Sequence, residues 1–238
     1  MSQKPDPHIS AEVKINLTIL VLGAMVMILN ETALSVALPT IMADFGIPAT
    51  SAQWLLTGFL LTMGVVIPTT GFLMDKFTTR QIFLASSGAF LAGTVLAALA
   101  PAFGVLLVGR VFQAAGTALM IPPLMTVAMT LVPPQRRGSV MGIISVVISV
   151  APALGPTVGG FVLSMSSWHV IFWTMAPLLG LICAAGYFRL VNVGDKRDTP
   201  LDFPSVVLSV FAFGGLVYAV SSLENMLEGD GLVDIVVL

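Results

Sequence analysis

The sequence predicts an all-α membrane protein whose helices cross a bilayer several times. Three observations favour this fold class: 57% of the 238 residues are apolar, only 9% are charged, and the mean hydropathy is +1.01. A soluble domain carries about 25% charged residues, so this chain lacks the side chains that would cover a water-facing surface. The net charge of −2 argues against a nucleic-acid partner, and the single cysteine, Cys183, excludes an internal disulfide framework.

Seven apolar stretches are long enough to cross a membrane. A hydrocarbon core of about 30 Å needs about 20 mostly apolar residues, at a rise of ~1.5 Å per helical residue. An eighth stretch begins near Gly231 and reaches the last residue, Leu238, before it is long enough to cross. We therefore expect the sequence to stop within a helix. The predicted spans are residues 15–38, 52–73, 82–100, 104–132, 138–163, 168–188 and 203–222.

The basic residues predict a cytoplasmic N-terminus. They gather in alternate loops. The loops between them contain no lysine or arginine, and their charged residues are acids such as Asp44 and Glu224. Because cytoplasmic loops carry the excess of cations, residues 1–14 are predicted to be a cytoplasmic tail and residues 189–202 a short cytoplasmic linker. The tail is polar and the first span is long, so we do not expect a cleaved signal peptide. The cations concerned are Lys4, Lys14, Lys76, Arg80, Arg136, Arg137, Arg189, Lys196 and Arg197.

The six spans between residues 15 and 188 contain a weak internal repeat. The run Pro68-Thr-Thr-Gly71-Phe-Leu in the second span parallels Pro156-Thr-Val-Gly159-Gly-Phe in the fifth. Because three is an odd number, two copies of a three-helix unit would cross the bilayer in opposite orientations. We therefore expect two inverted three-helix repeats, a pattern typical of secondary transporters.

Asn30 and Glu31 lie deep in the first span. A carboxylate at that depth is costly unless it is protonated, paired or in contact with water, which makes an intramembrane acid a candidate functional residue. Glu31 is therefore the better candidate for a proton site. The alternative is that Glu31 only hydrogen-bonds a neighbouring helix and never titrates.

Arg110 is the only lysine or arginine within an apolar stretch. Gln113 and Thr117 follow it at spacings of three and four, so the three side chains share one face of the fourth span. An arginine keeps its charge, so it must contact a carboxylate, backbone carbonyls or water. Two roles stay open: Arg110 modulates a nearby acid such as Glu31, or it clamps backbone carbonyls.

The fifth span carries a seam of small residues at alternating steps of three and four. Such seams let helix backbones approach closely, so we expect it to be a packing surface. The prolines of the seam remove backbone hydrogen bonds, and together with the cluster from Gly155 to Gly160 they predict a bend in this helix. The seam consists of Gly142, Ser145, Ser149, Pro152, Pro156 and Gly159.

Enzyme and nucleotide motifs are absent from the sequence. It contains no Gly-x-Ser-x-Gly, no His-Glu-x-x-His and no Gly-x-x-x-x-Gly-Lys run. We therefore predict no catalytic residues, no metal ligands and no enzymatic activity.

Four motifs, in order, resemble the major facilitator superfamily, and more closely its 14-helix drug:proton antiporter branch. Leu29 to Pro39 is similar to the first-helix signature of that branch, and Gly71 to Arg80 to the loop motif between helices two and three. Leu107 to Gly116 resembles the fourth-helix motif, and Gly155 to Gly160 the fifth-helix motif of antiporters. The matching positions that imply a conformational role are Gly71, Asp75, Lys76, Arg80, Gln113, Gly116, Gly155, Pro156, Gly159 and Gly160.

The resemblance implies a domain organisation and has three departures. Residues 15–188 would form the N-terminal six-helix bundle, and residues 203–238 helix seven with a truncated helix eight, so the C-terminal bundle needed for a complete transport path would be missing. The family usually has an aspartate where this chain has Asn30. Thr78 and Thr79 replace a glycine and a basic residue, and Ala114 replaces a glycine.

The function implied by the resemblance is proton-coupled efflux of amphipathic or cationic small molecules by alternating access. The chain would be a multi-pass protein of a bacterial cytoplasmic membrane, with the lipid bilayer and the transported molecule as partners. The proton gradient would drive transport without a cofactor. Two alternatives stay open: a non-transporting fragment, and a nutrient importer on the same fold, which the Gly155 to Gly160 cluster disfavours.

Overall fold

The computed structural model describes residues 9–193, 208, 211–212 and 215. Within these residues, six helical segments are long and apolar enough to span a membrane, which confirms the first six predicted spans. Apart from residues 208, 211–212 and 215, the predicted seventh span lies outside the described residues, as do the start of an eighth span and most of the predicted cytoplasmic tail and linker. The elements are α1 (Ala11–Phe45), α2 (Ala49–Ala52), α3 (Trp54–Val66), η1 (Ile67–Thr69), α4 (Thr70–Lys76), α5 (Thr79–Ala98), α6 (Phe103–Leu131), α7 (Pro134–Met165) and α8 (His169–Arg189).

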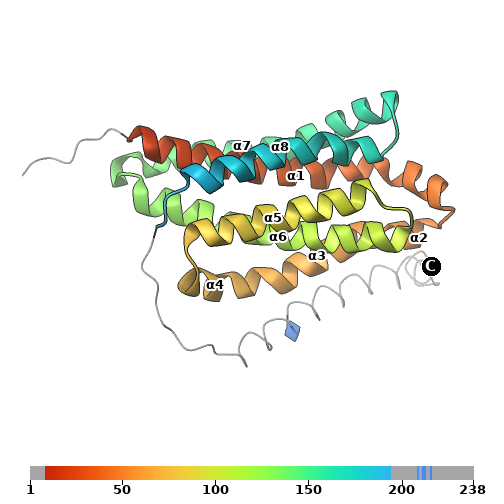
Figure 1. Ribbon diagram of the computed structural model, residues 1–238, viewed down its shortest axis with the longest axis horizontal. Coiled ribbons are helices and arrows are strands. Elements are labelled where there is room, and N and C mark those ends of the chain that lie inside the picture. The colour runs from red at the N-terminus through yellow and green to blue at the C-terminus, as the bar shows by residue number, and fades with distance from the viewer. Residues whose placement is uncertain (1–8, 194–207, 209–210, 213–214, 216–238) are drawn as a thin grey trace, which may run out of the picture.

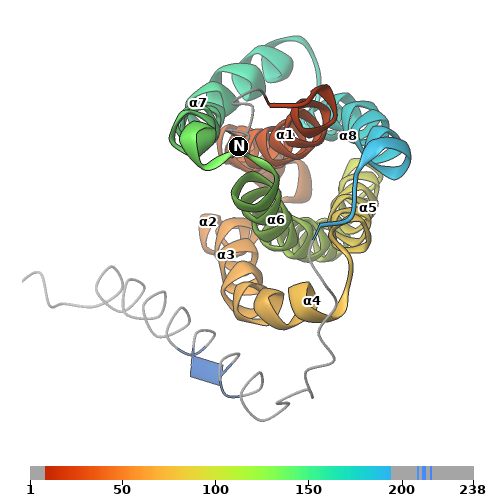
Figure 2. The ribbon, with the colours of Figure 1, turned by 90° about the vertical axis from the view of Figure 1, so that its left-hand side faces the viewer.

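The helices form one bundle with α1 and α6 in its middle (Figures 1 and 2). Helix α1 packs against α6, α7 and α8, and α6 packs against α1, α3 and α5. The first helix of each predicted triplet is therefore central and the second, α3 or α7, lies at a flank. The third helices, α5 and α8, pack against each other. Equivalent helices thus occupy equivalent places, as two three-helix repeats require.

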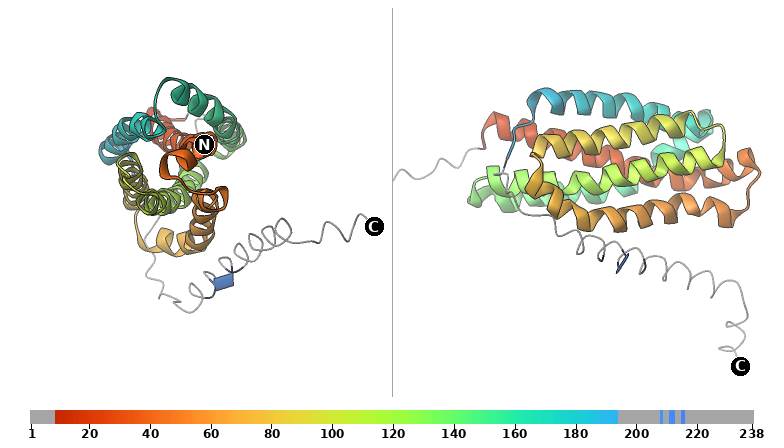
Figure 3. Two further views of the ribbon diagram at one scale, coloured as in Figure 1. Left: turned by 90° about the vertical axis from the view of Figure 1, so that its right-hand side faces the viewer. Right: turned by 60° about the horizontal axis from the view of Figure 1, so that its bottom comes forward.

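The cations of the described chain, apart from Arg110, gather at one end of the bundle, which we call the basic end. The starts of α1, α5 and α7 and the ends of α4, α6 and α8 meet there, as the two side views show (Figures 1 and 3). This grouping follows from the antiparallel order of the helices and from basic loops alternating with loops that lack cations. The cations are Lys14, Lys76, Arg80, Arg136, Arg137 and Arg189.

Local capping fixes where several helices begin and end. Ser10 accepts a hydrogen bond from the Val13 N–H at the start of α1, and Gly46 ends α1 with a φ of 61°, a conformation that favours glycine. Thr78 begins α5 through a capping box with Gln81. Thr78, which stands where the loop motif usually has a glycine, is thus the N-cap of α5. A threonine suits this position because its side-chain oxygen accepts a hydrogen bond from the first turn of the helix.

The second span is interrupted, whereas the fifth is continuous. Around Pro68 the α-helix gives way to the 3₁₀ turn η1, and the hydroxyls of Thr69 and Thr70 donate to the Val66 and Ile67 carbonyls at 2.7 Å. These bonds satisfy carbonyls near the proline, which has no N–H to donate. The two proline-containing spans therefore differ although their sequences match.

The seam of the fifth span was wrongly predicted to be a packing surface of this bundle. Five of its six residues are exposed, and only Gly159 is buried. Helix α7 instead turns the face of Ile144, Ala151, Gly155 and Gly159 towards its neighbours. The contact with α1 decides which face is buried, and the spacing of small residues alone does not reveal it. The exposed residues are Gly142, Ser145, Ser149, Pro152 and Pro156.

The backbones of α5 and α6 approach each other closely at two glycines. A Cβ atom on Gly116 would lie 2.6 Å from the Ser86 carbonyl oxygen, and one on Gly93 would lie 2.8 Å from the Gln113 nitrogen. At the same contact, the Ser86 hydroxyl donates to the Gly116 carbonyl at 2.7 Å. Small residues at such contacts let membrane helices gain van der Waals packing, which replaces the hydrophobic driving force of soluble proteins.

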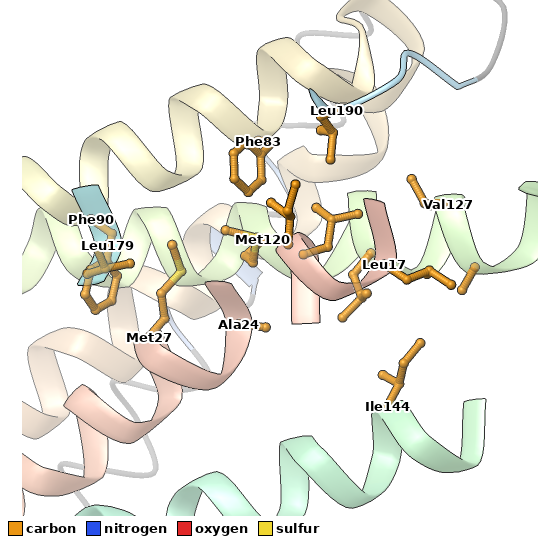
Figure 4. Packing of buried hydrophobic residues seen from close by; sticks show 14 of the residues in the cluster. Leu17, Ala24, Met27, Phe83, Phe90, Met120, Val127, Ile144, Leu179 and Leu190 are labelled. Carbon is orange, nitrogen blue, oxygen red and sulfur yellow. The ribbon is translucent and has the colours of Figure 1, made fainter. Parts of the chain in front are cut away.

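Two apolar clusters fill the spaces between the helices. The cluster nearer the basic end joins Met27 of α1, Phe90 of α5 and Met120 of α6, as Figure 4 shows. The cluster nearer the opposite end contains Trp168, whose indole N–H donates to the Asp44 carboxylate at 3.0 Å. This bond ties the end of α1 to the start of α8.

Replacing Gly116 by alanine is expected to destabilise the bundle by about 1–3 kcal/mol, since the added methyl group must displace backbone atoms of α5. Gly88→Ala is the matched control, because a Cβ there meets no atom within 4 Å. The measurement is thermal unfolding of the purified chain in detergent. Equal melting temperatures for the two variants would contradict the proposed close contact.

Candidate functional site

Arg110 lies fully buried in α6. Its Nε donates to the Leu55 carbonyl of α3 at 3.3 Å, and its Nη1 donates to Gln113 Oε1 at 2.9 Å. The guanidinium also stands 4.1 Å from the centre of the Phe59 ring, within the range of a cation–π interaction. The side chain thus clamps a backbone carbonyl, one of the two roles that the sequence left open.

Gln113 extends this contact from α6 to α5. Its oxygen accepts from Arg110, and its Nε2 donates to Thr94 Oγ1 at 2.9 Å. The Thr94 hydroxyl in turn donates to the Phe90 carbonyl at 2.8 Å. Both side chains are buried, so the hydrogen bonds replace lost contacts with water. The result is a polar chain from α3 through α6 to α5.

Thr117, the third member of the predicted stripe, is buried on the same face of α6. Its hydroxyl donates to the Gln113 carbonyl one turn earlier at 3.0 Å. It therefore satisfies its own helix and does not extend the polar chain to a neighbour.

Glu31 stands on α1, the other central helix, and is half-buried. It is close enough to Arg110 for the two charges to interact. Nε and Nη1 of Arg110 bond Leu55 and Gln113, and among the described residues Nη2 has no hydrogen-bond partner, so the link to Glu31 is electrostatic and not a direct ion pair. The second role left open by the sequence, an influence on a nearby acid, is thus also compatible with the geometry.

Three buried polar atoms of this region have no hydrogen-bond partner among the described residues. They are Nδ2 and Oδ1 of Asn30 and Nη2 of Arg110. Most buried polar atoms in proteins are hydrogen-bonded, and an orphaned one costs about 1–3 kcal/mol. Their positions in the two central helices give the middle of the bundle unused hydrogen-bonding capacity.

Two glycines of the cluster from Gly155 to Gly160 bring α7 into contact with α1, at the two residues that follow Glu31. A Cβ on Gly155 would meet the Thr32 side chain, and one on Gly159 would lie 2.6 Å from the Ala33 carbonyl oxygen. The other two members lie elsewhere, since Pro156 is exposed and a Cβ on Gly160 meets no atom within 4 Å. The structure therefore brings half of this motif to the acid-bearing helix.

The loop motif lies at the basic end, away from Arg110. Arg80 donates to the Tyr187 carbonyl and stands 4.8 Å from the Tyr187 ring centre. Lys76 lies 5.8 Å from the centre of the Phe72 ring. Gly71 is exposed with open space around it, and Asp75 is half-buried with no ion pair or hydrogen bond among the described residues.

Sequence reasoning missed three contributors to the site. The Leu55 carbonyl is a backbone atom and leaves no trace in the residue pattern. Phe59 and Thr94 are ordinary residues of apolar helices, and only their positions across from α6 give them a role. Among the described residues, no group of three His, Cys, Asp or Glu could hold a metal ion.

Thr94→Val is expected to destabilise the chain by about 1–3 kcal/mol, because it leaves the buried Gln113 amide without its acceptor. Thr62→Val is the matched control, since the Thr62 hydroxyl bonds only the Gly58 carbonyl of its own helix. Thermal unfolding of both variants, of Gln113→Leu and of a Thr94→Val/Gln113→Leu double variant measures the coupling. Additive effects in the double variant would contradict the hydrogen bond.

The family model described as Major Facilitator Superfamily matches residues 20–227. Among curated relatives, an MFS-type transporter of Bacillus subtilis, YcnB, is 46% identical over 207 residues, which are 87% of this chain and 44% of that protein. The lincomycin resistance protein LmrB of Bacillus subtilis is 42% identical over 212 residues, which are 89% of this chain and 44% of that protein. The chain thus spans less than half the length of these relatives.

Among solved structures, the fold is similar to a POT family transporter crystallised with a thioalcohol-conjugated peptide. The TM-score is 0.68 at 15% sequence identity, and the match covers 90% of this chain and 47% of that chain. At this identity the likeness concerns the fold alone.

Proposed function

The chain belongs to the Major Facilitator Superfamily, and from this membership we propose that it forms the N-terminal half of a proton-coupled exporter of amphipathic small molecules. The observation that carries the proposal is Arg110, a buried cation held by α3 and α6 within electrostatic reach of Glu31 on α1. The lincomycin-resistance name of one relative supports a drug as the exported molecule.

Glu31 is the proposed proton carrier. A fixed cation attracts a carboxylate and has no comparable attraction for the neutral acid, so the force between α1 and α6 depends on whether Glu31 holds a proton. Arg110 cannot change its own charge, and its bonds to Leu55 and Gln113 keep it in place. Proton binding and release at Glu31 would thereby change which arrangement of the two central helices is favoured.

The helix that carries Glu31 also has the means to move relative to its neighbour. Gly155 and Gly159 carry no side chain, so a shift of α1 along α7 need displace only the Thr32 side chain from the space beside Gly155. The orphaned Asn30 amide provides donors and acceptors one residue away from the acid, which suits water or a polar group of the transported molecule. Alternating access around such a midplane site is the proposed mechanism.

The proposed location is a bacterial cytoplasmic membrane with the basic end in the cytoplasm. The six described cations at that end support this orientation through the positive-inside rule. The same rule places the Asp44–Trp168 bond on the opposite side of the membrane. Proton movement down its gradient would then load Glu31 from the Asp44 side.

Glu31→Gln, in the complete transporter that contains this chain, is expected to abolish drug efflux driven by a pH gradient, because the amide cannot carry a proton. Glu31→Asp keeps a carboxylate and is expected to retain part of the coupling. The measurement is drug movement in reconstituted vesicles with an imposed pH gradient. Ser35→Ala, one turn further along α1, removes a hydroxyl that bonds only its own helix and is the matched control.

Unchanged proton-driven efflux in Glu31→Gln would remove Glu31 from the mechanism. Drug or nutrient uptake in vesicles of known polarity would instead favour the importer. A gene product without six or more further spans after Leu238 would favour the non-transporting fragment.

A further inference from the structure

We propose that the chain binds a zwitterionic amino-phospholipid in a pocket at the basic end, between the start of α1 and the end of α8. This lipid site is separate from Arg110 and Glu31 and does not rest on the proposed transport function. The pocket has a volume of about 500 Å³, within the usual range of small-molecule sites. It is lined by Glu12, Ile15, Phe188, Arg189, Leu190 and Val191.

One buried side chain holds the two walls of the pocket together. Asn16 is fully buried, and its Nδ2 donates to the Glu12 carbonyl of α1 at 2.8 Å. Its Oδ1 accepts from the Val191 N–H, beyond the end of α8, also at 2.8 Å. Leu190 is buried in the apolar cluster beside this bond. The pocket is therefore preorganised.

The second wall is also fixed from the side of α5. The Thr79 hydroxyl donates to the Val193 carbonyl at 2.9 Å, and the Arg80 N–H donates to Asn192 Oδ1 at 3.2 Å. The Arg80 guanidinium bonds the Tyr187 carbonyl in the last turn of α8. The chain that leaves α8 is thus bound to α1 and α5 along its described length.

The pocket carries one charge of each sign. Glu12 and Arg189 are exposed, and neither forms an ion pair with another described residue. A primary ammonium donates charge-assisted hydrogen bonds to a carboxylate, and a phosphate accepts from a guanidinium. A headgroup that contains both groups, such as phosphoethanolamine, complements the pair. A purely anionic headgroup would leave Glu12 opposed by a like charge.

Apolar side chains beside the charges favour a lipid over a free headgroup. Ile15 is 41% exposed, Tyr187 52% and Phe188 76%. Aromatic residues next to charged ones are typical of the membrane interface, where headgroups meet acyl chains. The acyl chains of the lipid would therefore contact these three side chains while its headgroup occupies the pocket.

The test is native mass spectrometry of the purified 238-residue chain in detergent, with phosphatidylethanolamine, phosphatidylcholine or phosphatidylglycerol added in equal amounts. We expect phosphatidylethanolamine to be retained about fivefold more strongly than either competitor, because only its headgroup offers both an ammonium donor and a phosphate. Glu12→Gln should reduce its retention to that of phosphatidylcholine. Arg189→Gln should weaken the retention of every phospholipid.

Lys76→Gln and Asp75→Asn are the matched controls, since they remove one charge of each sign at the same end but outside the pocket. Equal retention of the three lipids, or an unchanged preference in both pocket variants, would overturn the proposal. Binding of free phosphoethanolamine as strong as that of the lipid would overturn the choice of a lipid. If the pocket variants do not fold, hydrogen exchange of the unmodified chain decides: phosphatidylethanolamine must slow exchange at residues 188–191 and phosphatidylcholine must not.

Discussion

A positive charge that cannot be released, placed inside the bilayer, is the constraint on which the middle of this protein depends. Arg110 is fully buried, and the bundle satisfies it with a helix carbonyl, a glutamine and an aromatic ring from two helices. Leaving a buried charge without such partners costs several kcal/mol. The positions of α3, α5 and α6 relative to one another are therefore tied to a single side chain, and the acid on α1 lies within its field.

The glycine contacts make this polar chain possible. Gln113 reaches Thr94 because α5 and α6 approach at Gly93 and Gly116, where any side chain would meet backbone atoms. A wider separation would leave the Gln113 amide without an acceptor in an apolar environment. Close packing and the hydrogen bonding of buried polar groups thus depend on each other in this bundle. The small residues between α5 and α6 bring Gln113 to Thr94, and Gln113 in turn accepts a hydrogen bond from Arg110.

Sequence patterns predicted the six described spans, the placement of Arg110, Gln113 and Thr117 on one helix face, and the gathering of the other cations at one end. The bilayer itself sets the hydropathy of a span and the charge of the loops beside it, so both can be predicted from the sequence. The Leu55 carbonyl and the exposed face of α7 were not predictable, because both depend on how helices meet in space. The break of the helix at Pro68 was also not predictable from the sequence, since Pro156 lies in a similar run of residues and leaves its helix intact.

Two side-chain bonds at opposite ends have a mechanical consequence for α1 and α8. Asn16 joins the start of α1 to Val191, two residues after the end of α8, and Asp44 near the end of α1 joins Trp168 just before α8. A helix can slide past a neighbour only if the contacts along it change register together, typically by one turn of about 5.4 Å. With both ends fastened, such sliding would break both bonds at once. The antiparallel helices α1 and α8 are therefore expected to tilt together as one rigid body.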